Sequence, residues 1–225
     1  MPDVEWEKHA TKGLTFFGKM SASISHDIRN CLAIINEKAG LLDDLLSIAA
    51  GGGKPLEAEM VKDTAQAIMR QVRRADRIVV GLNRLAHSVD VPCCQVNLNE
   101  TAELVTTFSQ RLAAARKARL ELALPESVIQ VENSPFFLMH LLFYYIDMAV
   151  ESATDGLVKV QVEDAPESGR IGISGHPEPS KALGALPHRI ADLEKELGVT
   201  VGVASPGNRF VLEVPKAFRS KGLVK

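Results

Sequence analysis

The sequence predicts an α+β protein of two domains, in which a long antiparallel helical hairpin forms a dimeric four-helix bundle and an α/β sandwich follows it. Residues from about 10 to 90 carry apolar side chains at steps of three and four, which is typical of packed helices, and one strong helix breaker at residues 50–55 divides them. After residue 92 shorter helical patterns alternate with short apolar runs. The predicted domains are therefore residues 1–92 and 97–225.

Composition excludes several classes of protein. The chain has 225 residues, of which 46% are hydrophobic and 24% charged, so it is long and apolar enough to bury a core. Its 26 basic and 28 acidic residues nearly balance, which gives no electrostatic footprint for nucleic acid or an anionic membrane, and we expect neither as a partner. The three cysteines form no disulfide framework, and no signal peptide or membrane helix is evident, so we expect a cytoplasmic protein.

The two long helices have apolar stripes of similar period. The stripe of the first contains Phe17, Ile24, Ile28, Cys31, Ile35, Leu42, Leu45 and Ala49. The stripe of the second contains Ile68, Val72, Ala75, Val79, Leu82, Ala86 and Val89. An average spacing of about 3.5 residues indicates left-handed helix packing. One hairpin covers such stripes poorly, so we expect a homodimer of two hairpins, although a second domain folded against a single hairpin is the competing possibility.

The second domain is expected to mix helices with strand pairs. Asn99 is the expected cap of a helix that reaches about residue 116, and residues 134–135 open a strongly apolar helix to about residue 152. Strands are expected at 120–124, at 157–162 paired with 170–174, and at 199–204 paired with 209–214 across a turn at 206–208. A further helix is expected at 188–197.

The first helix carries a candidate chemical site. At about 100° per residue, His26 lies almost opposite the apolar stripe and should face water. Asn30, four residues later, shares that outer surface, while Asp27 lies on the flank toward the stripe. From geometry alone, an exposed histidine with a surface charge and a polar neighbour, and no chemical role, is the more ordinary interpretation.

Residues 17–30, FGKMSASISHDIRN, resemble the H-box of bacterial two-component sensor histidine kinases. The resemblance implies that His26 is the phosphoacceptor nucleophile and that Asp27 orients or deprotonates its imidazole. It also implies a phosphatase-like pattern, Asp27 followed by Asn30, in which the amide positions a water. Dimerisation through helical hairpins is a further expectation from this resemblance.

The second domain resembles the ATP-binding domain of that family in a degenerate form. Family members hold the nucleotide with an asparagine-rich helix, an Asp-x-Gly-x-Gly turn and a glycine-rich lid. In this chain Tyr144 and Met148 stand where asparagines are expected, and Asp147 is one position, or about 100°, away from a metal-binding register. Residues 174–178, SGHPE, lack the adenine-binding aspartate, and residues 179–187 contain one glycine. We therefore expect no bound ATP, cofactor or metal.

Arginines gather on the second helix, opposite its stripe. They are Arg70, Arg73, Arg74, Arg77 and Arg84. A solvated face explains them, and docking of an acidic partner by Arg29, Arg70, Arg73 and Arg77 is the functional alternative.

Together these features favour a histidine phosphotransferase of a phosphorelay, which passes phosphoryl groups between receiver-domain aspartates through His26. The expected partners are a second copy of the chain, response-regulator receiver domains and a hybrid sensor kinase, and Mg²⁺ would come with the receiver. An ATP-using kinase with a divergent site, in which Asp147 serves as a ligand after a register shift, stays open. So does a non-catalytic pseudokinase adaptor or phosphatase that acts on a response regulator.

Overall fold

The computed structural model describes residues 3–53, 55, 57–204 and 208–217. Its residues pack into two units, one formed by residues 21–84 and the other by the residues up to Met20 together with those from Leu85 onward. The predicted division into residues 1–92 and 97–225 stays a prediction about domain organisation in the chain.

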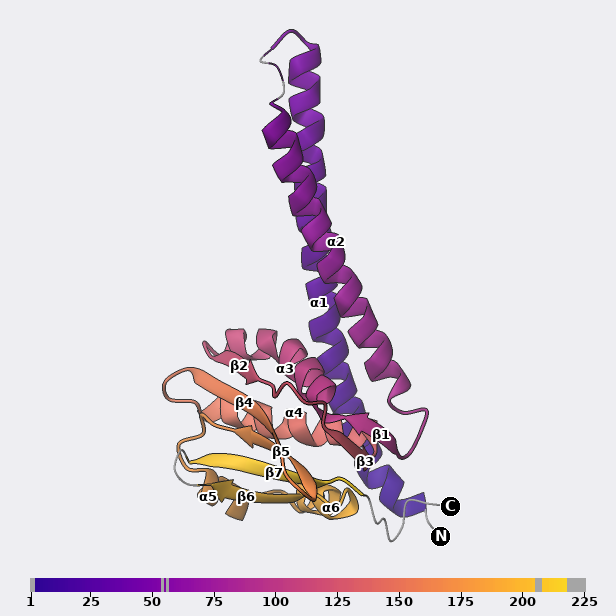
Figure 1. The fold of residues 1–225 in the computed structure, drawn as a ribbon, viewed down its shortest axis with the longest axis vertical. Coiled ribbons are helices and arrows are strands. Elements are labelled where there is room, and N and C mark those ends of the chain that lie inside the picture. Colours follow the sequence, from indigo (N-terminus) through magenta and orange to yellow (C-terminus); the bar gives the residue numbers. More distant parts are fainter. Residues whose placement is uncertain (1–2, 54, 56, 205–207, 218–225) are drawn as a thin grey trace. The chain divides into compact units, whose positions relative to one another are not determined.

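The unit of residues 21–84 is the predicted helical hairpin (Figure 1). It contains most of α1 (Asp3–Ala50) and of α2 (Ala58–His87), which run antiparallel on either side of the glycine-rich break. The apolar period explains the pairing, because Ile24, Cys31 and Ile78 are buried at heptad-compatible positions. Ile78 was not part of the stripe predicted for the second helix, whereas Val72 and Val79, which were, are 46% and 41% exposed.

The other unit contains a five-stranded sheet and a separate two-stranded one. Its elements are β1 (Cys94–Asn97), α3 (Leu98–Ala115), β2 (Arg119–Ala123), β3 (Gln130–Asn133), α4 (Pro135–Ser152), β4 (Leu157–Asp164), β5 (Ser168–Ile173), α5 (Pro179–Gly184), α6 (His188–Glu196), β6 (Thr200–Ala204) and β7 (Arg209–Pro215). The large sheet has the order β2-β4-β5-β7-β6, with β2 and β4 parallel and the other neighbours antiparallel. The small sheet pairs β1 with β3 antiparallel.

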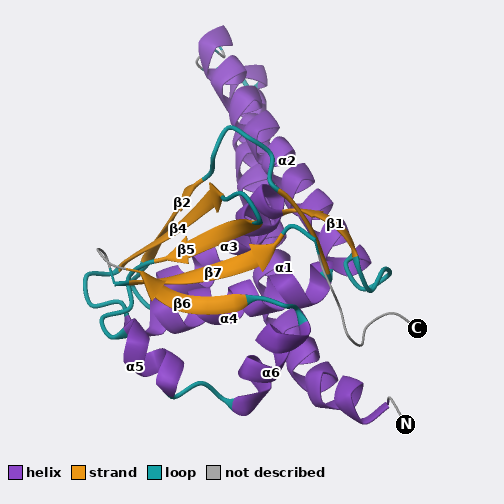
Figure 2. Cartoon of the chain, turned by 60° about the horizontal axis from the view of Figure 1, so that its bottom comes forward, coloured by secondary structure: helices purple, strands orange, loops and turns teal. Residues whose placement is uncertain are grey.

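Helices α3 and α4 pack on one face of the five-stranded sheet, which gives the predicted α/β sandwich (Figure 2). Alternation along the strands explains the layering, since every second side chain of β4 and β7 is buried beneath the helices. Helix α4 is apolar around most of its circumference because the sheet covers one side of it and other helices cover the rest. The buried residues of α4 include Leu138, Leu141, Leu142, Tyr145, Ile146 and Ala149.

Several details differ from the prediction. Asn97, not Asn99, caps α3, and its Oδ1 accepts hydrogen bonds from the backbone N–H groups of Asn99 (3.1 Å) and Glu100 (3.3 Å). The helix therefore begins at Leu98, two residues earlier than a cap at Asn99 would give, and the fully buried Leu98 starts its apolar face. Strands β1 and β3 and helix α5 were not predicted, while both predicted hairpins are confirmed. Of the predicted turn at 206–208, only Asn208 lies within the described residues.

Residues 13–20 of α1 pack on α4. Phe16 is only 2% exposed, and its ring lies 5.5 Å from that of Phe136, 5.3 Å from His140 and 5.3 Å from Phe143. A Cβ at Gly13 would lie 3.0 Å from the Phe136 ring, so the backbone of α1 approaches closely there. The predicted stripe named Phe17 in place of Phe16, because it did not anticipate α4 as a neighbour of this segment.

None of the helices in the described part of the chain combines the length and apolar character that crossing a membrane requires.

Candidate functional site

His26 lies on the outer surface of the helical hairpin, as the sequence predicts. It sits two residues after the buried Ile24, so its side chain points away from the helix pair, and 45% of that side chain is exposed. Water and a docked partner can therefore reach the ring.

Asp27 and Asn30 both lie beside one nitrogen of this ring. The amide nitrogen of Asn30 is 3.2 Å from Nδ1 of His26, a hydrogen-bond distance, because residues four apart on a helix are neighbours. Oδ1 of Asp27 is 3.8 Å from the same Nδ1, and its side chain is 20% exposed. Within the described residues Nε2 has no hydrogen-bond or ion-pair partner. The ring thus directs Nε2 outward and keeps Nδ1 against its own helix.

The chemistry available to this arrangement is nucleophilic. A neutral imidazole nitrogen with a free lone pair attacks electrophilic phosphorus, and a carboxylate near the other nitrogen stabilises the positive charge that develops on the ring. The three predicted site residues are therefore brought together, although their roles stay predictions.

The hairpin also carries the predicted basic surface. Arg29 on α1 and the arginines at 70, 73 and 77 on α2 are all exposed, and in the part of the chain that the structure describes none of them pairs with a carboxylate. Steps of three and four place the last three on one face of α2. This face can attract an acidic surface.

Asp147 on α4 is held by two cations. Its Oδ2 lies 3.1 Å from Nζ of Lys19, and its Oδ1 pairs with the guanidinium of Arg116, the residue that caps the end of α3. Lys19 also lies over the Phe143 ring, 5.5 Å from its centre. A carboxylate with two cationic partners is a poor ligand for Mg²⁺, which needs several oxygen ligands. A register shift of Asp147 into a metal site would have to break both pairs.

Aromatic side chains fill the space between α4 and the sheet. Tyr145 is fully buried, its ring centre lies 5.3 Å from that of the equally buried Phe210, and the His176 ring is 5.4 Å from Phe210. The Tyr145 hydroxyl donates a hydrogen bond to Glu194 of α6. Burial raises the pKa of Glu194 although this hydrogen bond opposes the rise, and burial also raises the pKa of Tyr145. Burial has the opposite effect on the basic imidazole of His176, whose pKa it lowers.

The segment that would grip a nucleotide is short and tight. Gly175 has a φ of +111°, and a Cβ there would lie 2.7 Å from the Leu157 carbonyl oxygen. The following residues continue directly into α5, a helix of six residues, in place of a glycine-rich loop. Among the described residues no group of three or more His, Cys, Asp or Glu side chains is arranged to hold a metal ion.

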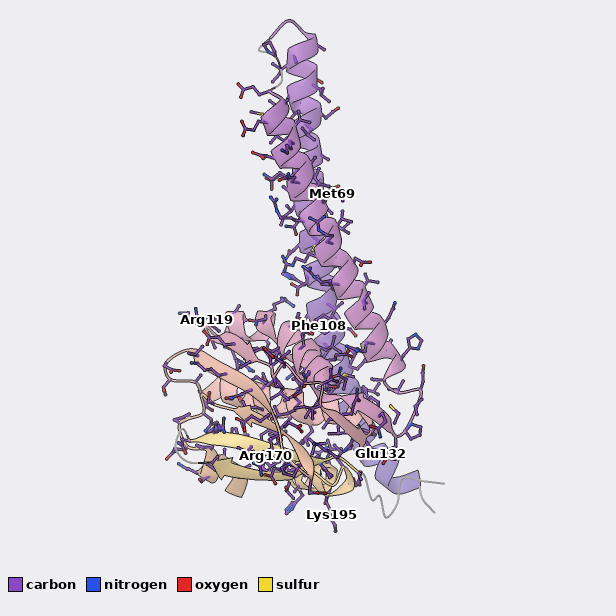
Figure 3. The ribbon with its side chains drawn as sticks, viewed as in Figure 1. Met69, Phe108, Arg119, Glu132, Arg170 and Lys195 are labelled. Atoms are coloured by element: carbon purple, nitrogen blue, oxygen red, sulfur yellow. The ribbon has the colours of Figure 1, made fainter. Side chains whose placement is uncertain are left out.

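The outer face of the five-stranded sheet has an open hollow of about 400 Å³. Its charged residues satisfy one another, since Arg170 lies 2.7 Å from Glu213 and Arg209 lies 3.2 Å from Glu163. Arg170 is marked in Figure 3. Because these charged side chains are paired with one another, the hollow shows no evident group for binding a ligand.

The sequence matches no protein-family profile and no curated protein. The structure is similar to solved histidine kinases. The catalytic domain of the histidine kinase ThkA has a TM-score of 0.49 and 18% identity over 57% of this chain and 100% of that domain. ThkA in complex with the response regulator protein TrrA has a TM-score of 0.47 and 19% identity over 96% of this chain and 66% of that one. A bacterial phosphotransferase structure has a TM-score of 0.46 and 16% identity, with 89% and 95% covered.

Sequence reasoning missed three participants in these sites. Lys19 and Arg116, which pair with Asp147, are 128 and 31 residues away from it in the sequence. Glu194, which accepts the hydrogen bond from Tyr145, is 49 residues away from that tyrosine. The hydrophobic periodicity of a helix or strand does not indicate contacts between residues so far apart in the sequence. The one signal in the sequence was the carboxylate at Asp147 itself, on a mostly apolar helix.

Proposed function

We propose that this chain is a histidine phosphotransferase, which takes a phosphoryl group from a receiver-domain aspartate onto His26 and passes it to a second receiver. The observation that carries the proposal is the disposition of the His26 ring. Nδ1 is covered by Asn30 and Asp27, and Nε2 points into solvent, where an aspartyl phosphate can approach in line.

The transfer step needs little from the chain beyond position and charge. Nε2 attacks phosphorus, the bond from phosphorus to the aspartyl oxygen breaks, and Asp27 stabilises the positive ring. The exposed arginines at 29, 70, 73 and 77 supply an attractive surface for the acidic pocket of a receiver. The Mg²⁺ that assists phosphoryl transfer belongs to that pocket.

We also propose that the chain works without ATP. Three observations support this: the two cations on Asp147, the buried contact of Tyr145 with Phe210, and the tight turn at Gly175. A kinase that uses ATP would have to displace all three.

The working form is expected to be a homodimer. On the hairpin Met69, Val72 and Val79 are between 41% and 51% exposed, and on α1 Leu32 and Leu46 are more than half exposed. Met69 is marked on α2 in Figure 3. A second hairpin would bury these side chains, and sedimentation would then report two chains of 24.4 kDa.

The decisive experiment incubates the chain with phosphorylated receiver domains from the same cell. We expect label on the wild type and none on His26→Gln. His87→Gln is the matched control, because His87 is also exposed and lies 2.7 Å from a carboxylate, that of Asp90, yet should keep its label. If no receiver labels the wild type, the proposal fails. If ATP labels His26, the chain is a kinase.

A further inference from the structure

The two neighbours of Nδ1 in His26 favour opposite positions of the ring proton. The amide nitrogen of Asn30, at 3.2 Å, is only a donor, so its hydrogen bond requires a lone pair on Nδ1. The Asp27 carboxylate, at 3.8 Å, is only an acceptor and draws a proton to Nδ1. Of the two, only Asn30 is within hydrogen-bond distance. Since a neutral imidazole has one N–H, the Asn30 contact places that proton on Nε2.

We propose that Asn30 is a positioning residue that selects the ring tautomer of His26 in opposition to Asp27. In the resting protein it keeps the outward Nε2 protonated, and therefore not nucleophilic. The inference rests on the proposed function, because it concerns the same nitrogen that would accept the phosphoryl group.

Phosphoryl transfer then includes a proton rearrangement. The proton leaves Nε2 and one binds Nδ1 by exchange with water, which reaches the exposed ring, and Asp27 stabilises the new N–H. The Nε2 lone pair forms the nitrogen–phosphorus bond as the bond between phosphorus and the receiver's aspartyl oxygen breaks, and that electron pair stays on the receiver's carboxylate. The ring is left positive, with Nδ1–H facing Asp27.

Asn30 acts again after the transfer. When the positive phosphorylated ring loses its Nδ1 proton to water, Nδ1 regains a lone pair and accepts the Asn30 amide. Asn30 thus stabilises the resting ring and the neutral phosphorylated ring, whereas Asp27 stabilises the ring during transfer.

The first test measures the tautomer directly. Nitrogen-15 spectra of histidine-labelled full-length protein at about pH 8.5, where an ordinary imidazole is neutral, separate the two N–H forms. His26→Gln identifies the His26 signals among the six histidines. In Asn30→Leu, which keeps the bulk and loses the donor, the ratio of the two forms should shift toward Nδ1–H about fivefold, the value of one ordinary hydrogen bond. Asn36→Leu, an exposed asparagine of the same helix, is the control and should leave the ratio unchanged.

The second test measures reactivity with phosphoramidate, a small donor that needs no docking surface. Asn30→Leu should be phosphorylated on His26 about fivefold faster than the wild type, and Asn36→Leu at the wild-type rate. Asn30→Asp, which only accepts, should shift the tautomer ratio in the same direction and provides a variant of nearly identical shape.

An unchanged tautomer ratio in both Asn30 variants overturns the inference, even if receivers still label His26. Slower labelling of Asn30→Leu by phosphoramidate also overturns it. If the ratio shifts as expected but no receiver labels the wild type, the inference about the ring holds and the proposed function fails.

Discussion

The packing of Phe16 on α4 gives a prediction of stability that can be worked out from the structure. Phe16 is 2% exposed and contacts three rings. Truncation of a buried phenylalanine to alanine costs about 3–5 kcal/mol. For a chain of this length each kcal/mol lowers the melting temperature by about 2–4 °C. Taking about 4 kcal/mol, Phe16→Ala should melt about 8–16 °C below the wild type, as measured by calorimetry.

Leu14→Ala is the matched control. Leu14 lies in the same turn of α1 but is 71% exposed, so its truncation should change stability by less than about 0.5 kcal/mol, or about 2 °C. Equal melting temperatures for the two variants would refute the reasoning, because the segment of α1 around Phe16 would then contribute no packing on α4.

Three further predictions concern the sandwich. Tyr145→Phe leaves the half-buried Glu194 without its donor and should cost about 1–2 kcal/mol in urea unfolding, whereas Tyr144→Phe, which loses no hydrogen bond, should not. Burial raises the folded-state pKa of Glu194, so its contribution to stability is present below the unfolded pKa and is lost as pH rises through the folded one. The stability of Glu194→Gln relative to the wild type should therefore grow as the pH rises above about 4.3, the ordinary pKa of a glutamate, and a difference independent of pH would contradict this. Gly175→Ala should lower the free energy of unfolding by about 1–3 kcal/mol because of its positive φ and the close Leu157 carbonyl. Gly184→Ala, with open space around it, should be nearly neutral. Equal midpoints of urea unfolding for the two variants would count against this account.

The helical hairpin could be predicted because its information is local. The steps of three and four around Ile24 and Cys31 indicate directly which face α1 buries, and the exposed position of His26 follows from the same geometry. The hairpins β4–β5 and β6–β7 were predictable for the same reason, since each joins neighbouring apolar runs across a turn.

The features that could not be predicted depend on contacts between residues far apart in the sequence. Strands β1 and β3 have four residues each and lie more than 30 residues apart, so neither forms a recognisable run with its partner. The burial of Phe16 in place of Phe17 depends on α4, about 120 residues later. In the candidate site, the placement of Asn30 and Asp27 beside His26 follows from helix geometry, but which of the two reaches hydrogen-bond distance is set by side-chain rotamers that sequence does not report.

The ion pairs of Asp147 bear on how this chain can evolve. Replacing Lys19 or Arg116 alone leaves the other cation on the carboxylate, and replacing Asp147 alone leaves two positive charges where a divalent ion would have to sit. No single one of these changes therefore creates a metal ligand. Under the proposal that the chain works without ATP, freeing Asp147 to bind a metal requires changes on α1 and at the end of α3 together, so selection acting on one substitution at a time has no gradual route to a metal ligand at this position.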